Sequence, residues 1–186
     1  MATTISLPTA VTTNSITGSN LFAADGTNTT GVWDDTHADV ELSGFSSLSI
    51  PSGATINGIE VIVNGQGNPA ANTPKIVVHN GTSYSSSYNF LGSFSKGNST
   101  FDPGWGGSGN LFGLSWTPTT AAGIKVLIPS STIQPSGRRL YWDYVKVRIT
   151  YTAASGYGHD VNGVAAANIG KVNGIATASI EKVNGI

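Results

Sequence analysis

The chain has 186 residues and a formal net charge of −1, and only 10% of its residues are Asp, Glu, Lys or Arg, so its surface must consist largely of Ser, Thr, Asn and Gly. This balance excludes the basic surface that nucleic acids or anionic membranes require, and the lack of cysteine excludes disulfides, thiolate nucleophiles and Cys-ligated zinc. No apolar run approaches the ~18 residues that span a bilayer, and the first residues lack the basic and apolar regions of a secretion signal, so we expect synthesis in a cytoplasm without Sec export.

Residues 1–153 have the composition of an all-β domain. Segments rich in Val, Ile, Thr and Tyr are separated by Gly, Pro, Asn and Ser, and the pattern predicts strands in the order 31–33, 40–42, 59–63, 76–78, 124–128 and 141–151. The segment 76–78, Ile-Val-Val, is apolar throughout, which indicates a strand buried on both faces. No eleven-residue window has the apolar spacing of an amphipathic helix.

The segment 141–151 is the clearest strand. Val145, Val147 and Ile149 fall on one face, and Lys146 and Arg148 fall on the other, which is the period of two expected of a strand with one wet side.

Turn signals separate the predicted strands: Pro51-Ser52-Gly53, Asn57-Gly58, Asn64-Gly65 and Pro135-Ser136-Gly137. Their spacing predicts a jelly-roll-like antiparallel β-sandwich over residues 1–153, followed by a small, Gly-spaced linker at 154–160.

Residues 161–186 repeat every eleven residues around Val-Asn-Gly. This period also suits a right-handed helical supercoil, but an Asn-Gly pair in each unit would cost a helix about 1.5 kcal/mol per repeat. Asn-Gly between β-branched residues is a strong hairpin signal, so we expect a non-helical tail of tight turns joined by short extended pieces. Such a segment buries too little surface to fold alone, so we expect it to dock onto a partner. The expected docking residues are Val161, Asn162, Gly163, Val164, Ile169, Val172, Asn173, Gly174, Ile175, Ile180, Val183, Asn184, Gly185 and Ile186.

Three segments of the chain together resemble a known family of domains. In chain order they are IPSGATINGIEV (50–61), LFGLSWTP (111–118) and DYVKVRITY (143–151). They resemble a β-sandwich domain recurrent in virion proteins of tailed bacteriophages, in which a strand–turn–strand element precedes an LWG-x-x-WTP loop and a final strand. Phe112 stands where that family has the Trp of LWG. The Val-Asn-Gly repeat also resembles short repeats beside jelly-roll or lectin-like modules of phage structural proteins. The resemblance covers about residues 15–153 and implies a virion component rather than an enzyme.

The residues offer little catalytic chemistry. His37, His79 and His159 lie in unrelated contexts, and none has a second His at metal-ligand spacing. The acidic cluster at 34–39 could serve as a calcium loop or a general-acid pair, but it lacks the Asp-x-Asp-x-Asp-Gly pattern, so a solvated loop is favoured. We therefore expect no catalytic residue, no metal site and no cofactor.

A Gly-rich segment at 101–109 surrounds Trp105. An exposed Trp on a sandwich loop can stack against a sugar, with Tyr84 and Tyr88 as further platforms. The competing interpretation is that Trp105 plugs one end of the sandwich or belongs to a subunit contact. Trp116 is expected to be structural, and Arg138-Arg139 is expected to lie in a solvated turn near Trp142.

Two functional hypotheses follow. The first is a structural protein of a phage particle, a capsid decoration or cement protein or a small head- or tail-fibre component, which forms a homotrimer and binds capsid or tail subunits after synthesis in the host cytoplasm. The second is a carbohydrate-binding adhesion module at a tail tip, with a host glycan as ligand. An enzyme such as a depolymerase is disfavoured because the ten acidic residues are mostly scattered.

Overall fold

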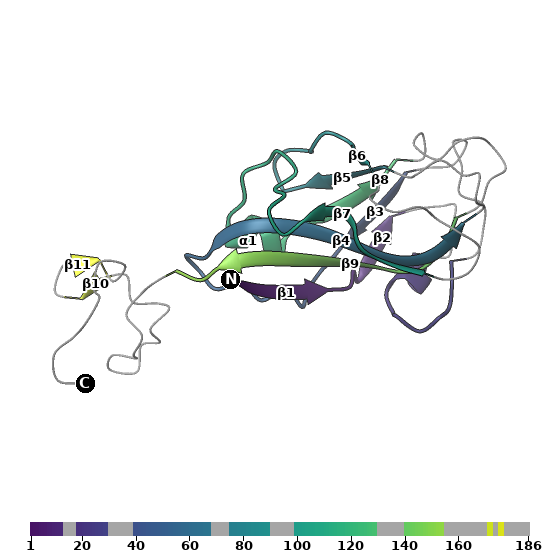
Figure 1. Ribbon diagram of the computed structural model, residues 1–186, viewed down its shortest axis with the longest axis horizontal. Helices are drawn as coiled ribbons and strands as arrows, with labels where there is room; N and C mark the ends of the chain where they lie inside the picture. The colour runs from purple at the N-terminus through teal and green to yellow at the C-terminus, as the bar shows by residue number, and fades with distance from the viewer. Residues whose placement is uncertain are drawn as a thin grey trace.

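The computed structural model of the chain describes residues 1–12, 18–29, 39–67, 75–89, 99–129, 140–154, 171–172 and 175–176. Within them the protein is mostly β, as predicted. The strands form two antiparallel sheets with apolar side chains from both in one core, which is a sandwich-like arrangement (Figure 1).

The first sheet has four strands, β1 (Ala2–Ser6), β9 (Leu140–Thr152), β4 (Thr55–Gly67) and β7 (Ser99–Gly107), side by side in that order. The second has five strands, β2 (Ala10–Thr12), β3 (Val40–Ser43), β8 (Lys125–Ile128), β5 (Lys75–His79) and β6 (Tyr88–Asn89). A 3₁₀-helix η1 (Gly18–Leu21) and a short helix α1 (Pro118–Ala122) connect strands. Separately, β10 (Lys171–Val172) pairs with β11 (Ile175–Ala176).

The two longest strands, β4 and β9, lie next to each other in the first sheet. The alternation predicted for 141–151 is confirmed, because Val145, Val147 and Ile149 are fully buried and Lys146 and Arg148 are partly exposed. On β4, the facing residues Ile59, Val61 and Val63 are also fully buried, so the two strands present one continuous apolar face to the core.

Two of the predicted turns are wrong, because Asn57-Gly58 and Asn64-Gly65 both lie inside β4. The pairing of β4 with β9 shifts by one residue at each: Asn57 is the extra residue on β4, and Asp143 is the extra residue on β9. These are β-bulges, which explains why both Trp142 and Val145 point into the core although they are three residues apart.

Glycine is required in β4 for close approach rather than for a turn. A Cβ atom added at Gly58 would lie 2.2 Å from the backbone carbonyl carbon of Ser108, and one added at Gly65 would lie 2.6 Å from the carbonyl oxygen of Tyr141. The predicted turn at 51–53 is confirmed: the Ala54 N–H donates to the Pro51 carbonyl at 3.2 Å, and Gly53 has a φ of 80°.

The core is filled from both sheets. Its largest side chains are Trp105 and Trp142, whose ring centroids lie 5.9 Å apart at an interplanar angle of 55°. Trp116 packs half-buried against this core and donates its Nε1–H to the Leu111 carbonyl at 2.9 Å, so its expected structural role is confirmed. Helix α1 is too short for any periodic signal, and it begins at a capping box between Thr117 and Thr120.

The other strand predictions agree with the structure where it describes them. The segments 40–42, 59–63 and 76–78 fall in β3, β4 and β5, and 124–128 matches β8 except for its first residue. Ile76, Val77 and Val78 are all buried. The predicted strand at 31–33 and the turn at 135–137 lie outside the described residues. The sequence patterns did not predict strands β1, β2, β6 and β7.

Candidate docking surface

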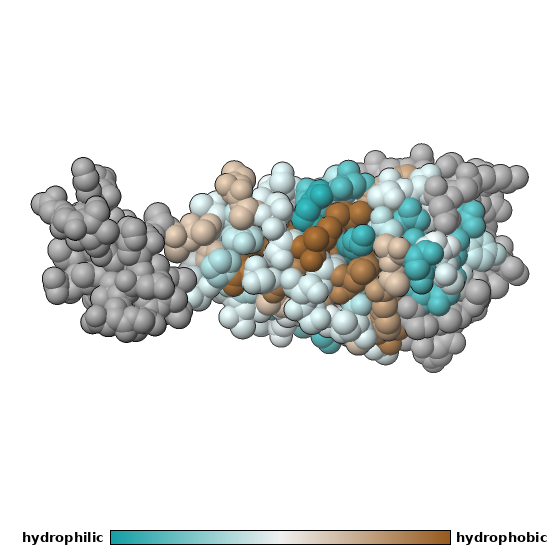
Figure 2. All heavy atoms as spheres, turned by 90° about the horizontal axis from the view of Figure 1, so that it is seen from below, coloured by the Kyte–Doolittle hydropathy of each residue, from teal (hydrophilic) through white to brown (hydrophobic). Residues whose placement is uncertain are grey.

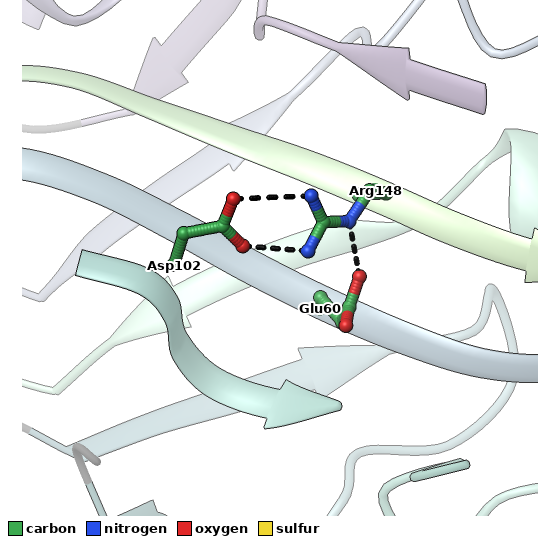
Figure 3. A network of polar contacts seen from close by, with 3 residues as sticks. All are labelled: Glu60, Asp102 and Arg148. Atoms are coloured by element: carbon green, nitrogen blue, oxygen red, sulfur yellow. Dashed lines mark hydrogen bonds and ion pairs between the residues drawn. The ribbon is translucent and has the colours of Figure 1, made fainter. Parts of the chain in front are cut away.

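Three strands of the four-stranded sheet are joined on their outer face by an ion network (Figure 3). The guanidinium of Arg148 on β9 donates through Nε to the carboxylate of Glu60 on β4, and its Nη1 and Nη2 donate to the two oxygens of Asp102 on β7 at 3.1 and 2.5 Å. Glu60 is only 6% exposed, so removing Arg148 would leave a buried carboxylate without its cation. The hydrogen bond to Glu60, and after it the bond to Asp102, raises the pKa of Arg148 above its ordinary value, so the guanidinium stays charged.

A second polar row lies on the same sheet. The Asn64 amide donates to the Thr100 hydroxyl at 2.8 Å, and that hydroxyl lies 3.3 Å from the Tyr144 hydroxyl. The Lys146 ammonium sits over the Tyr144 ring, 4.1 Å from its centroid. These contacts restrict the long side chains of this face.

Strand β1 forms an edge of this sheet. It pairs with β9 from Ala2↔Tyr151 to Ser6↔Val147, and in the part of the chain that the structure describes no backbone hydrogen bond joins β1 to any other segment. The backbone of the loop after β3 bonds to hydroxyl groups of β1: the Ser47 N–H donates to the Ser6 hydroxyl at 3.1 Å, and the Ser49 N–H donates to the Thr4 hydroxyl at 3.2 Å. Among the described residues, the outer backbone edge of β1 is therefore not paired with another strand.

A groove of about 410 Å³ lies beside this edge. Its apolar lining residues are Ile5, Leu7, Pro8 and Phe22. Hydroxyl groups come from Ser6, Thr9, Ser46 and Ser47, and the charged residue in the lining is Lys146. Ile5 is 46% exposed, which is unusual for a large aliphatic side chain on a strand. Figure 2 views the molecule from below, the side on which β1 lies in Figure 1, and hydrophobic residues gather in the middle of that face with hydrophilic ones beside them. We call the free edge of β1 together with this lining the β1 groove.

The interpretation of Trp105 as an exposed sugar platform is wrong. The residue lies on β7 opposite Val61 and is fully buried against Trp142. The glycines around it form the end of a strand rather than a loop: a Cβ added at Gly106 would lie 2.3 Å from the Ile59 carbonyl oxygen, so glycine allows the close packing that buries the indole. Of the two competing interpretations, a plug inside the sandwich agrees with the full burial of Trp105, and a subunit contact stays a prediction.

The two tyrosines considered with Trp105 differ from each other. Tyr84 is 57% exposed and stacks on His79 with 4.3 Å between ring centroids, in a loop fixed by Asn80, whose side-chain oxygen accepts the Thr82 and Ser83 N–H groups. Tyr88 packs half-buried on Phe112, with 4.5 Å between the rings. Of the three candidates, only Tyr84 presents most of its ring to solvent.

Much of the remaining predicted chemistry lies outside the described residues. This holds for His37, His159, the acidic residues at 34–35 and the pair Arg138-Arg139. Among the residues that the structure describes, no group of three or more His, Cys, Asp or Glu side chains could hold a metal ion. Within the same ranges, no helix is long and apolar enough to cross a membrane.

Of the expected docking residues in the repeat, the structure describes Val172 and Ile175, which pair with each other in β10 and β11 across Asn173-Gly174. This places an extended piece on either side of the Asn-Gly pair, as a tight turn requires. The first and third Val-Asn-Gly units lie outside the described residues.

The described residues thus form an all-β protein with two antiparallel sheets, a polar outer face and an apolar groove beside the edge strand β1. No protein-family model matches the chain, and neither the curated proteins nor the solved structures contain a significant match.

Proposed function

We propose that the protein is a structural component of a bacteriophage particle, a capsid decoration or cement subunit or a small head- or tail-fibre subunit, which binds neighbouring virion subunits. Support comes from where the three segments of the phage resemblance lie. Residues 50–61 lead into β4 and residues 143–151 belong to β9, its neighbour in the sheet. Residues 111–118 begin beside β4, since the Ile59 N–H donates to the Asn110 carbonyl at 2.8 Å. The three motifs therefore belong to one packing unit.

We further infer a jelly-roll connectivity. Without β2, the strand orders are β1-β9-β4-β7 and β3-β8-β5-β6, and the chain alternates between the sheets from β3 to β5 and from β6 to β9. An eight-stranded jelly roll with two Greek keys has these two strand orders. In this assignment, β2 extends the second sheet beyond β3.

The observation that carries the docking role is the repeat hairpin. Strands β10 and β11 have two residues each, and among the described strands they pair only with each other. An isolated two-stranded hairpin is marginal in water even when it is longer than this, so the repeat gains stability from a surface that it contacts. In a homotrimeric particle component, that surface belongs to a neighbouring subunit.

The experiment compares particles assembled with the full chain and with a variant that lacks residues 155–186. The shortened chain is expected to remain a folded β-sheet protein by circular dichroism and to be missing from purified particles. A matched control keeps the length and composition of 161–186 but shuffles their order, and it should be missing as well. Normal incorporation of either variant would refute the docking role. Labelled antibody on the particle then distinguishes head from tail.

One observation favours the second candidate, a carbohydrate-binding module at a tail tip. Tyr84 is exposed on a fixed loop, and the ion pair between Lys125 and Glu41, at 2.9 Å, lies on the same sheet, where Lys125 stands opposite His79. Binding on a glycan array that Tyr84→Ala abolishes, with particle assembly unchanged, would favour this function.

A further inference from the structure

The free edge of β1 offers hydrogen-bonding groups in addition to the apolar groove. In an antiparallel ladder, every second residue directs its N–H and C=O away from the neighbouring strand, and β1 has β9 on one side only among the described strands. An occupant that is itself extended can pair with this row and place alternate side chains against Ile5 and its neighbours. The β1 groove therefore suits a strand.

The repeat has the chemistry that this groove requires. Between 161 and 186 the sequence carries three charged residues, Lys171, Glu181 and Lys182, and the rest are aliphatic, small or amide side chains. A nearly uncharged segment can enter an apolar groove without the cost of desolvating charges. The charged residue in the groove lining is Lys146, and Glu181 is the one carboxylate side chain of the repeat that could pair with it.

The direction of the chain indicates whose repeat fits. Tyr151, near the end of β9, pairs with Ala2 at the start of β1, so the chain leaves the sheet where β1 begins. If the chain turned straight back from β9, the first strand of its own repeat to enter the β1 groove would run parallel to β1. Every strand pair among the described residues is antiparallel, and antiparallel pairing is the more stable of the two. A repeat from another molecule can enter in the antiparallel direction.

We propose that the β1 groove binds the Val-Asn-Gly repeat of a second copy of this chain as an added antiparallel strand. This inference rests on the proposed docking role of the repeat and names its partner. Each copy has one groove and one repeat, so a ring in which every copy donates its repeat to the next is closed and leaves no groove empty. Exchange of this kind also covers an edge strand that would otherwise promote aggregation.

Disulfide cross-linking in the full-length protein tests the proposal without a cysteine background, because the chain has no cysteine. Ile5→Cys is placed in a chain with one tag, and Val161→Cys, Val172→Cys or Val183→Cys is placed in a chain with a second tag. The two chains are co-expressed and oxidised. Tyr84→Cys, which replaces a similarly exposed residue at the other sheet, is the matched control for Ile5→Cys.

We expect at least one repeat position to give about tenfold more mixed-tag product with Ile5→Cys than with Tyr84→Cys, because docking raises the effective concentration of the thiols. If both cysteines are placed in one chain and only internal cross-links form, the repeat binds its own sandwich and the proposal is wrong. A yield no higher than the control at all three positions would also overturn it. Repeat-dependent incorporation into particles without a mixed cross-link would leave the proposed function standing and assign the repeat to a different virion protein.

Discussion

Arg148 on β9 stands directly opposite Glu60 on β4 and holds both carboxylate oxygens of Asp102 on β7. One guanidinium thus neutralises two carboxylates and joins three strands of the sheet. On the other side of β9, Ile5 of β1 lies opposite Arg148. The same row of residues therefore connects the ion network to the β1 groove, so damage to the network is expected to alter the groove as well.

Arg148→Met should destabilise the protein because it leaves Glu60 as a buried carboxylate without its cation. We expect a loss of about 2–3 kcal/mol in the free energy of unfolding, somewhat below the 3–5 kcal/mol of a fully buried pair, since the Arg148 side chain is 27% exposed. Urea denaturation measures this loss. Asp102→Asn removes the more exposed partner and should cost less than about 1 kcal/mol. Equal losses for the two variants would contradict the dependence of Glu60 on Arg148.

Gly58→Ala should be among the most damaging small substitutions in the sandwich. Its Cβ would lie 2.2 Å from the backbone of Ser108, which cannot rotate away as a side chain can, and we expect a loss of about 3 kcal/mol. Gly109→Ala adds the same atom one residue beyond Ser108, where nothing lies within 4 Å, and should change stability by less than about 0.5 kcal/mol. Thermal unfolding of the two variants side by side checks the difference. A tolerated Gly58→Ala would mean that β4 and β7 are farther apart than the structure has them.

The fold class could be predicted from the sequence because the central strands obey simple rules. Residues 145–149 alternate strictly between apolar and charged side chains, and 76–78 are apolar throughout, and both patterns agree with the observed burial. The edge strand β1 could not be predicted in the same way. Its sequence, ATTIS, has a single large apolar residue, and that residue faces out.

Local rules failed where glycine serves packing between distant segments. Asn57-Gly58 has the sequence of a turn, but its glycine allows the approach of Ser108, about fifty residues later in the chain. The glycines around Trp105 likewise suggested a loop, whereas Gly106 lies against Ile59 and Phe112. A sequence pattern of a few residues cannot predict contacts between residues that are far apart in the chain. The β1 groove was missed for the same reason, since it joins β1 and the residues after it, Phe22 just after η1, the loop after β3, and β9.

Trp105→Ala should affect stability rather than ligand binding. Removing a fully buried indole that packs against Trp142 is expected to cost about 3–5 kcal/mol. Tyr84→Ala removes a mostly exposed ring and should change the free energy of unfolding by less than about 0.5 kcal/mol. Chemical denaturation compares the two, with intrinsic fluorescence reporting the Trp environment. A stable, folded Trp105→Ala variant would show that the indole is not part of the core.

The hydrogen bond accepted by Asp25 should make the stability of the folded protein depend on pH in the acid range. The Asp25 carboxylate accepts the Thr27 N–H at 2.8 Å, and this bond lowers the pKa of Asp25 below its usual value in the folded protein. The next residue ties the same loop to β9, since the Gly26 N–H donates to the buried Asp143 at 2.9 Å. Because the folded-state pKa is depressed, the stabilisation is complete above the unfolded-state pKa of about 3.9 and is lost as pH falls through the lower folded-state value.

Asp25→Asn keeps an acceptor oxygen but no titrating group, so the difference in Tm between the native protein and this variant isolates the charge. The native protein is expected to melt higher at about pH 6, and the gap should narrow as the pH falls through the lowered folded-state pKa of Asp25. Asp25→Ala also removes the acceptor, so its Tm should lie below that of Asp25→Asn throughout this pH range. A gap between the native protein and Asp25→Asn that stays constant from pH 6 to pH 2.5 would mean that the Thr27 bond does not favour the ionised carboxylate.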